Sequence, residues 1–179
     1  QEHPPGREGV FDFTDAKDLG VRIAGELLAH LLFVFKLSCS GWTWAQVAFG
    51  ETYEAMVEGL QGAWWELEGC PEVARHDNLS AATHELKRSG GRSLTRRFRA
   101  VLDHYGLRST RIRPGEAHEN GVAERGNGLV KQALAQALVL RGSLDFLSVA
   151  QYQAFVDEVV ERAFNRPAAA EIAAEKTCL

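Results

Sequence analysis

The segment that decides the fold is residues 10–15, VFDFTD, in which aromatic and polar side chains alternate around an aspartate. Alternation with a period of two is typical of a β-strand that buries one face. Asp12 and Asp15 are three residues apart, so they point to opposite faces of this strand and only one can join a shared site. Asp12 lies within the regular strand and Asp15 near its end, which favours Asp12 as a functional carboxylate.

The rest of the chain predicts a meander followed by alternating helices and strands. Short apolar segments bounded by turn residues predict strands over 21–24, 27–37, 43–49, 72–76 and 107–112. Apolar residues at helical spacing predict helices over 53–67, 93–105, 122–140 and 149–164, the second capped by Ser93. The predicted fold class is α/β: a mixed five-stranded sheet, three antiparallel strands then two parallel ones, flanked by helices. This is the order of elements in the ribonuclease-H-like fold.

Composition predicts one ordinary globular domain with no membrane segment. The chain has 179 residues, a net charge of −4 and a pI of about 5.9. Its longest apolar run, 27–35, is far shorter than the roughly 20 residues that span a bilayer, so it predicts a buried strand. Three scattered cysteines without a C-x-x-C pair argue against a zinc knuckle or a disulfide framework and fit a reducing cytoplasm.

The chain divides into three expected segments. Residues 1–9 are polar and rich in proline and glycine, so they predict a leader or linker. The chain starts without a methionine, so we expect a fragment of a longer protein. Residues 10–166 form the predicted core, and 167–179 have the composition of a helix that connects to a further region.

Three carboxylates fall where such a sheet would gather them: Asp12 in the first strand, Asp77 after the 72–76 strand, and Glu124 in the first turn of the 122–140 helix. At about 4 Å and an effective dielectric near 20, each like-charged pair costs about 4 kcal/mol, so the cluster needs a cation. Oxygen donors without a His or Cys set suit Mg²⁺ or Mn²⁺, and two such ions would support phosphoryl displacement. Spacing alone leaves an ordinary explanation open, in which Asp77 caps a turn and Glu124 favours a helix N-terminus.

Local sequence around each carboxylate adds a family resemblance. Residues 10–14 (VFDFT), 76–82 (HDNLSAA) and 119–125 (ENGVAER) resemble the three D-D-E blocks of the integrase catalytic core. The closest resemblance is to IstA-type insertion-sequence transposases, and it covers nearly all of residues 3–166.

The resemblance implies a polynucleotidyl transferase, the catalytic domain of a DNA transposase or integrase. In that family the residues at Asp12, Asp77 and Glu124 bind two metal ions. Water cuts DNA at an element end, and the freed 3′-hydroxyl attacks target DNA in strand transfer.

The resemblance also implies residues that contact DNA. Lys131 lies seven residues after Glu124, two turns along the same helical face, where integrase-type enzymes place a basic residue. The plain alternative for Lys131 is a solvated helix position. The other residues near the D-D-E blocks that we expect to contact DNA are Asn78, Asn120 and Arg125.

The distribution of charge predicts where DNA lies. Residues 87–113 contain nine basic residues and one acid, a local charge of +8, so the rest of the chain carries −12. Arg96 and Arg97 lie mostly off the apolar face of their helix, and Lys87 and Arg88 fall in an expected glycine-rich loop over 79–93. A solvated helix face explains any single arginine better, whereas the block as a whole favours a phosphate-binding surface.

Three functions remain open from the sequence. The first is metal-dependent DNA 3′-end cleavage and strand transfer. The alternatives are a catalytically silent DNA-binding or assembly module and a ribonuclease-H-like nuclease that only hydrolyses. The resemblance further implies an AAA+ ATPase helper protein, a homodimer or higher assembly, and action in the bacterial cytoplasm at the nucleoid.

Overall fold

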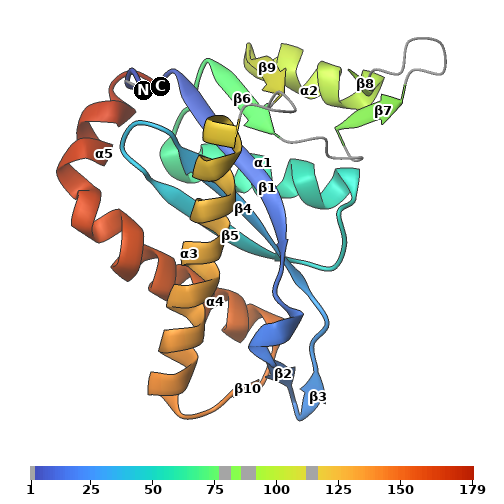
Figure 1. Cartoon of the computed structure of the whole chain (residues 1–179), viewed down its shortest axis with the longest axis vertical. Helices are drawn as coiled ribbons and strands as arrows, with labels where there is room; N and C mark the ends of the chain where they lie inside the picture. The colour runs from blue at the N-terminus through green and yellow to red at the C-terminus, as the bar shows by residue number, and fades with distance from the viewer. Residues whose placement is uncertain (1–2, 77–81, 86–91, 112–116) are drawn as a thin grey trace.

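The computed structural model describes residues 3–76, 82–85, 92–111 and 117–179, and its centre is a five-stranded sheet (Figure 1). The strands lie in the order β5-β4-β1-β6-β9. Their bounds are Glu8–Asp15 for β1, Leu31–Leu37 for β4, Thr43–Ala48 for β5, Val73–His76 for β6 and Arg108–Arg111 for β9. β4 pairs antiparallel with β1 and β5, and β6 pairs parallel with β1 and β9. The predicted sheet is therefore confirmed.

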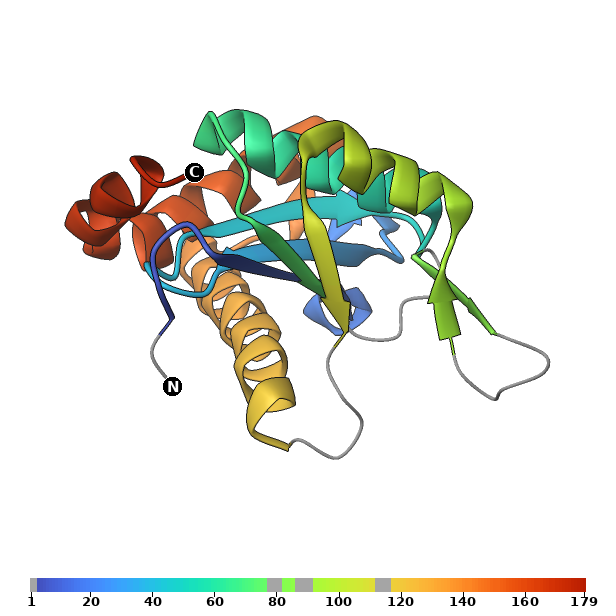
Figure 2. The same ribbon diagram turned by 90° about the horizontal axis from the view of Figure 1, so that it is seen from above.

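Helices cover both faces of this sheet. α1 (Tyr53–Leu67) and α2 (Arg96–Tyr105) lie on one face, and α3 (Ala117–Arg141) crosses the other (Figure 2). α4 (Val149–Val160) packs along β5. The chain then continues through a π-helical turn, η2 (Glu161–Asn165), and a 3₁₀ turn, η3 (Arg166–Ala168), into α5 (Ala169–Lys176). Among the described residues, no helix has the length and apolar character needed to cross a bilayer.

The predicted strand over 27–37 was wrong at its start. Leu27 is 61% exposed and belongs to a small second sheet, and β4 begins only at Leu31. Residues 28–30 between them are not part of either strand. The Leu28 N–H donates to the Val21 carbonyl at 2.8 Å, and the His30 carbonyl accepts from the Ala16 N–H at 3.2 Å. The second sheet joins β10 (Asp145–Phe146), β2 (Arg22–Ile23) and β3 (Glu26–Leu27), next to the 3₁₀ turn η1 (Lys17–Leu19).

The segment before α2 also differs from its prediction. The loop expected over 79–93 contains β7 (Thr83–Glu85) and β8 (Arg92–Leu94), which pair antiparallel. Ser93 lies in this ribbon opposite His84, so it does not cap the helix. Thr95 is the N-cap instead, since its hydroxyl accepts from the Phe98 N–H at 3.2 Å. α3 begins at Ala117, earlier than the predicted residue 122.

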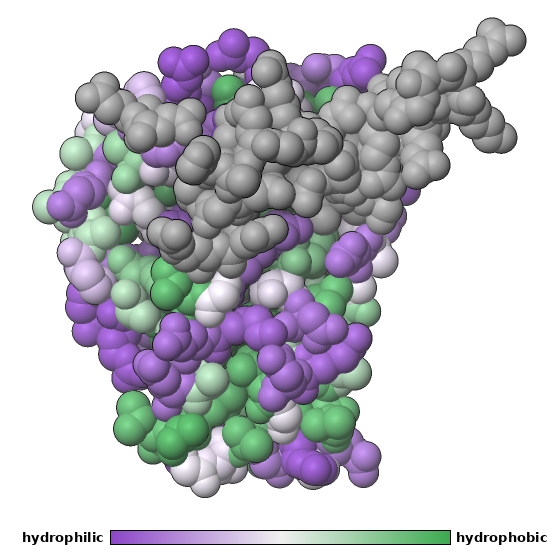
Figure 3. Space-filling view, in the orientation of Figure 1, coloured by the Kyte–Doolittle hydropathy of each residue, from purple (hydrophilic) through white to green (hydrophobic). Residues whose placement is uncertain are grey.

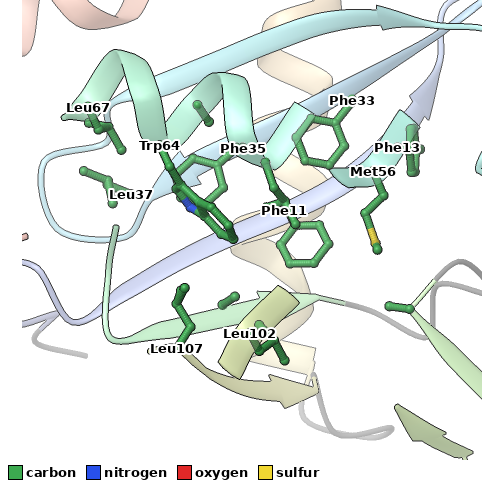
Figure 4. Packing of buried hydrophobic residues seen from close by; sticks show 14 of the residues in the cluster. Phe11, Phe13, Phe33, Phe35, Leu37, Met56, Trp64, Leu67, Leu102 and Leu107 are labelled. Atoms are coloured by element: carbon green, nitrogen blue, oxygen red, sulfur yellow. The ribbon is translucent and has the colours of Figure 1, made fainter. Parts of the chain in front are cut away.

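The alternation along β1 divides the core into two layers. Phe11 and Phe13 point toward α1 and pack against Phe33, at ring-centroid distances of 5.9 and 5.4 Å (Figure 4). Burial of each such side chain contributes about 1.5–3 kcal/mol. On the opposite face, the residues that pack together are Leu32, Val34, Val130, Leu134, Tyr152 and Val156.

Two amide side chains close the outer edge of β5. Gln153 of α4 accepts from the Val47 N–H at 2.7 Å and donates to the Ala45 carbonyl at 2.9 Å. Asn165 accepts from the Thr43 N–H at 2.8 Å and donates to the Thr43 carbonyl at 3.0 Å. An open strand edge is a template for pairing with another chain, so these contacts protect the sheet.

A buried carboxylate ties α5 to the sheet. Glu175 is 0% exposed, and its two carboxylate oxygens accept from the Gly6 N–H at 3.0 Å and the Ser40 N–H at 2.8 Å. The segment expected to lead to a further region thus packs against the entry of β1. Gly6 is itself buried and β1 begins at Glu8, so the end of the expected leader is part of this packing.

Replacing Glu175 by glutamine tests this contact. The amide NH₂ cannot accept a hydrogen bond, so Glu175→Gln leaves one buried backbone N–H without its acceptor. We expect the free energy of unfolding to fall by about 1–3 kcal/mol in urea titrations. Glu171→Gln, on the exposed side of the same helix, is the matched control and should change stability by less than about 0.5 kcal/mol. Equal stability of the two variants would contradict the structural role of Glu175.

Candidate active site

Asp12 lies at the centre of the sheet, on the face that α3 crosses. It is in the middle of β1, which is the central strand of the five in the sheet, and it pairs with Val34 of β4. Its side chain is half-buried and points away from the aromatic layer of Phe11 and Phe13. Asn127 of α3 donates a hydrogen bond from Nδ2 to Oδ2 of Asp12 at 3.2 Å. The strand and the helix therefore meet at this carboxylate.

α3 brings the position of Glu124 to the same place. Glu124 precedes Asn127 by three residues, and positions three apart are neighbours on one face of a helix. Because Asn127 contacts Asp12, this face of the N-terminal part of α3 is the one turned toward β1. The side chains of Asn120, Glu124 and Arg125 lie outside the described residues.

β6 ends beside Asp12. Its last residue, His76, pairs with Phe11 and is fully buried. The His76 Nε2 atom lies 3.1 Å from the Ser109 hydroxyl of β9, and its ring contacts Phe11 and Phe98 at centroid distances of 5.3 and 5.7 Å. These contacts fix the strand end that precedes Asp77 in the sequence. Asp77 and Asn78 lie outside the described residues, so the meeting of three carboxylates stays a prediction.

A small cavity of about 40 Å³ opens next to Asp12. Its walls include Val34, Lys36, Gly126 and Asn127. The Lys36 ammonium lies 5.9 Å from the centre of the Phe164 ring, and burial lowers the pKa of this lysine. About 10–15 Å³ of such accessible space is enough for one water molecule, so the cavity has room for a water-sized group beside the carboxylate.

The C-terminal end of β1 carries a separate set of charges. Lys131, predicted to hold DNA, forms an ion pair with Asp18 at 2.9 Å. Asp15 accepts from the Lys17 N–H at 2.8 Å, and this hydrogen bond is the main reason that the pKa of Asp15 lies below its ordinary value. Asp15 is thus engaged away from Asp12, which agrees with the choice of Asp12. The role of Lys131 in binding DNA stays a prediction.

The predicted basic surface is described only in part. Arg96 and Arg97 are exposed at the start of α2, as expected. Arg97 pairs with Glu54 at 3.0 Å and stacks over the Tyr53 ring at 4.1 Å, so it already has protein partners. Two other predicted DNA contacts, Lys87 and Arg88, lie outside the described residues.

The donors around Asp12 fit a hard divalent cation. A carboxylate and a side-chain amide supply oxygen atoms, which Mg²⁺ and Mn²⁺ prefer. Among the described residues, no thiol or imidazole lines the adjoining cavity. Within the described ranges, no three His, Cys, Asp or Glu side chains gather as a metal-binding group. Of the three predicted ligands, Asp12 is the one whose side chain is described, so the binding of a metal stays a prediction.

Asn127 is the site residue that sequence analysis missed. The sequence does hint at Asn127. It lies on the same face of the predicted helix as Glu124, and it is polar whereas the next residues on that face are apolar. Nothing in the local sequence identifies its partner, which is 115 residues away along the chain.

No model of a known protein family matches this chain. The uncharacterized protein y4jA/y4nE/y4sE of Sinorhizobium fredii is 45% identical over 163 residues, which cover 90% of this chain and 32% of that protein. A transposase for insertion sequences IS1326/IS1353 of Pseudomonas aeruginosa is 25% identical over 148 residues, which cover 83% of this chain and 28% of the transposase. The chain thus spans about a third of the length of these relatives.

Solved retroviral structures share the architecture. The HTLV-2 integrase catalytic core domain in complex with magnesium, in its dimeric form, superposes with a TM-score of 0.63 at 18% identity, covering 88% of this chain and 85% of that one. A chain of the simian T-cell lymphotropic virus intasome in complex with PP2A regulatory subunit B56 gamma superposes with a TM-score of 0.66 at 20% identity. The match covers 88% of this chain and 48% of that one. This chain has the ribonuclease-H-like fold of an integrase catalytic core. The fold and the resemblance expected from the sequence are confirmed.

The burial of Lys36 should make the free energy of unfolding of this chain depend on pH. Burial lowers its folded pKa below the ordinary value of 10.5, so the charged ammonium destabilises the folded state at neutral pH. Between the lowered pKa and 10.5 the unfolded chain binds more protons, so wild-type stability rises with pH in that window.

We expect Lys36→Met to raise the free energy of unfolding by about 1 kcal/mol near neutral pH. This gain should shrink as the pH approaches 10.5, the ordinary lysine pKa. Urea titrations at a series of pH values measure it. Lys17→Met, at a side chain that is 59% exposed, is the control, and the same pH dependence in both variants would rule out the effect of burial.

Proposed function

We propose that this chain is the catalytic domain of a DNA transposase or integrase that cleaves DNA 3′ ends and joins them to target DNA. The observation that carries the proposal is the contact between Asp12 on the central strand and Asn127 on α3, one turn after Glu124. Asp77, the residue after β6, would complete the D-D-E set. The similarity to an insertion-sequence transposase and the integrase-core fold support this function.

Two phosphoryl transfers make up the proposed reaction. In the first, a water oxygen attacks phosphorus at an element end and the bond from phosphorus to the 3′ oxygen breaks, leaving a 3′-hydroxyl. In the second, the oxygen of that hydroxyl loses its proton and attacks phosphorus in the target strand, displacing the target's own 3′ oxygen. Neither step forms a bond to the protein, so no Ser or Tyr nucleophile is needed.

The role of the chain's own residues in this reaction is to hold and orient the metal ions. Asp12, Asp77 and Glu124 would hold two Mg²⁺ or Mn²⁺ ions, which when bound activate the attacking oxygen and stabilise the leaving one. Asn127 orients the Asp12 carboxylate through its 3.2 Å hydrogen bond. The aromatic layer beneath β1 keeps this first ligand rigid, so little reorganisation is needed when a cation binds.

DNA would run across the surface around these residues. Phosphate contacts by lysine and arginine supply most of the affinity of such an interface and make it sensitive to salt. The residues proposed to make contacts to DNA are Asn78, Lys87, Arg88, Arg96, Arg97, Asn120, Arg125 and Lys131.

We also propose that the chain acts within a homodimer or higher assembly, with an AAA+ ATPase helper, in the bacterial cytoplasm at the nucleoid. Apolar side chains gather at the end of the molecule that holds β2, β3 and β10 (Figure 3). Exposed apolar side chains that gather at one end of a molecule are typical of a protein contact surface, which supports an assembly. The exposed residues at this end are Leu27, Val139, Leu140, Leu144 and Leu147.

The decisive experiment mixes the full-length protein with its element-end DNA, a supercoiled target plasmid and Mn²⁺. We expect joined products from the wild type and a loss of about 1000-fold or more in Asp12→Asn, Asp77→Asn and Glu124→Gln, because each removes a metal ligand worth several kcal/mol in the transition state. Asp15→Asn is the matched control, since it removes an exposed carboxylate from the same strand.

Each other outcome has a defined meaning. Cleaved ends without joined products would indicate a nuclease that only hydrolyses. DNA binding with neither product would indicate a silent assembly module. Strand transfer that survives Asp77→Asn would overturn the assignment of the site.

Asn127→Ala tests the positioning role separately. A hydrogen bond to a charged group contributes about 1.5–3 kcal/mol, so we expect strand transfer to fall by about tenfold or more. The Mn²⁺ concentration for half-maximal activity should rise as well, because the first ligand is less well oriented. Gln132→Ala, at an exposed position of α3, is the control for the helix. A lower rate with an unchanged Mn²⁺ requirement would contradict the role given to Asn127.

A further inference from the structure

The sheet face that carries Asp12 continues beyond α3. Strand pairing forms two neighbouring rows of residues on this face. The first row is Glu8 of β1, Val73 of β6 and Arg108 of β9. The second row, two residues further along each strand, is Val10, Arg75 and Thr110. Figure 2 shows β6 and β9 extending past α3 on this side. An open groove of about 420 Å³ lies here. The polar residues that line it are His3, Arg7, Glu8, Arg75, Arg108 and Thr110.

Three arginines from three adjacent chain segments converge on this groove. The Arg7 carbonyl accepts from the Val73 N–H at 2.9 Å, and the Arg108 N–H donates to the Glu72 carbonyl at 2.9 Å, so the segments lie side by side. Arg75 lies on the floor, where it pairs with Glu8 at 2.8 Å and both side chains are less than one-fifth exposed. Arg7 and Arg108 form the exposed rim.

The rim is available to a new anion. Arg108 pairs with Glu72 at 2.9 Å, but the two side chains are 71% and 63% exposed, and such a pair contributes little and exchanges readily. Arg7 has no ion-pair partner among the residues that the structure describes. Guanidinium groups match phosphate oxygens in planar, two-pronged hydrogen bonds, and the exposed Thr110 hydroxyl adds a donor.

The position of the groove relative to Asp12 suits a DNA backbone. Glu8 and Asp12 are four residues apart on one strand, a distance of about 13 Å at 3.3 Å per residue. Along one strand of B-DNA the rise is about 3.4 Å per nucleotide, so 13 Å corresponds to about four base pairs. A duplex that ran along β1 with one phosphate at Asp12 would pass over the groove at this spacing.

We propose that the groove between Arg7 and Arg108 binds the sugar–phosphate backbone of duplex DNA about four base pairs from the scissile phosphate. This inference rests on the proposed function. It assigns a DNA contact to the segment before β1, which lies outside the basic block 87–113.

The test measures binding of this chain to a short fluorescein-labelled duplex by anisotropy across a series of NaCl concentrations, without divalent metal. The variant is the double substitution Arg7→Gln with Arg108→Gln, both at exposed positions. The matched control is Arg162→Gln with Arg166→Gln, which removes the same charge from exposed positions next to β5, the opposite edge of the sheet. Thermal unfolding confirms that all variants remain folded.

We expect the dissociation constant of the groove variant to rise about tenfold at low salt. Its salt slope should be shallower than that of the wild type by about 1 to 2, because Arg108 is already paired with Glu72. The control should keep the wild-type salt slope. The variant Arg7→Lys with Arg108→Lys, which keeps both charges, should have most of the wild-type salt slope. Equal slopes in groove and control variants would overturn this inference and leave the proposed function standing. Wild-type protein that binds no DNA would overturn both, and tighter binding of polyglutamate than of DNA would indicate an acidic protein partner instead.

Discussion

β1 places a carboxylate and a hydrophobic layer on opposite sides of one strand, and the rest of the structure depends on this. Phe11 and Phe13 lie in the core under α1, and Asp12 between them faces α3. A one-residue slip in register would turn Asp12 into the aromatic layer and move the phenylalanines to the face that α3 covers. Pairing with β4 on one side and β6 on the other makes such a slip costly. Aromatic packing therefore fixes the position of the candidate metal ligand.

α3 continues the same logic on the other face. Val130 and Leu134 bury the helix against the sheet, and they lie three and seven residues after Asn127, on one helical stripe. Extending this stripe toward the N-terminus leads from apolar residues to Asn127 and then to Glu124. A helix docked by its apolar residues thus presents polar positions to Asp12 at its next turns. The candidate site thus lies where polar residues interrupt the apolar patterns of β1 and α3.

These two patterns explain how much the sequence could predict. Periodicities of two and 3.6 are local, so the order of the main strands and helices and the mixed sheet follow from them. The choice between Ser93 and Thr95 as the cap depends on whether Ser93 pairs with His84, which is a tertiary contact. The partners of Asn127, Asn165 and Glu175 lie more than 100 residues away and have no local signature.

The proposed binding of DNA depends on surface cations that are in part already paired with carboxylates. Lys131, Arg97 and Arg108 pair with Asp18, Glu54 and Glu72, each at an exposed or partly exposed position. When a phosphate takes such a cation, the released carboxylate must be solvated and acquires its own counterions, so part of the gain from counterion release is offset. Arg7 has no such partner among the described residues. Per phosphate contact, Arg7 should therefore contribute more of the salt dependence than Arg108, although both carry one charge.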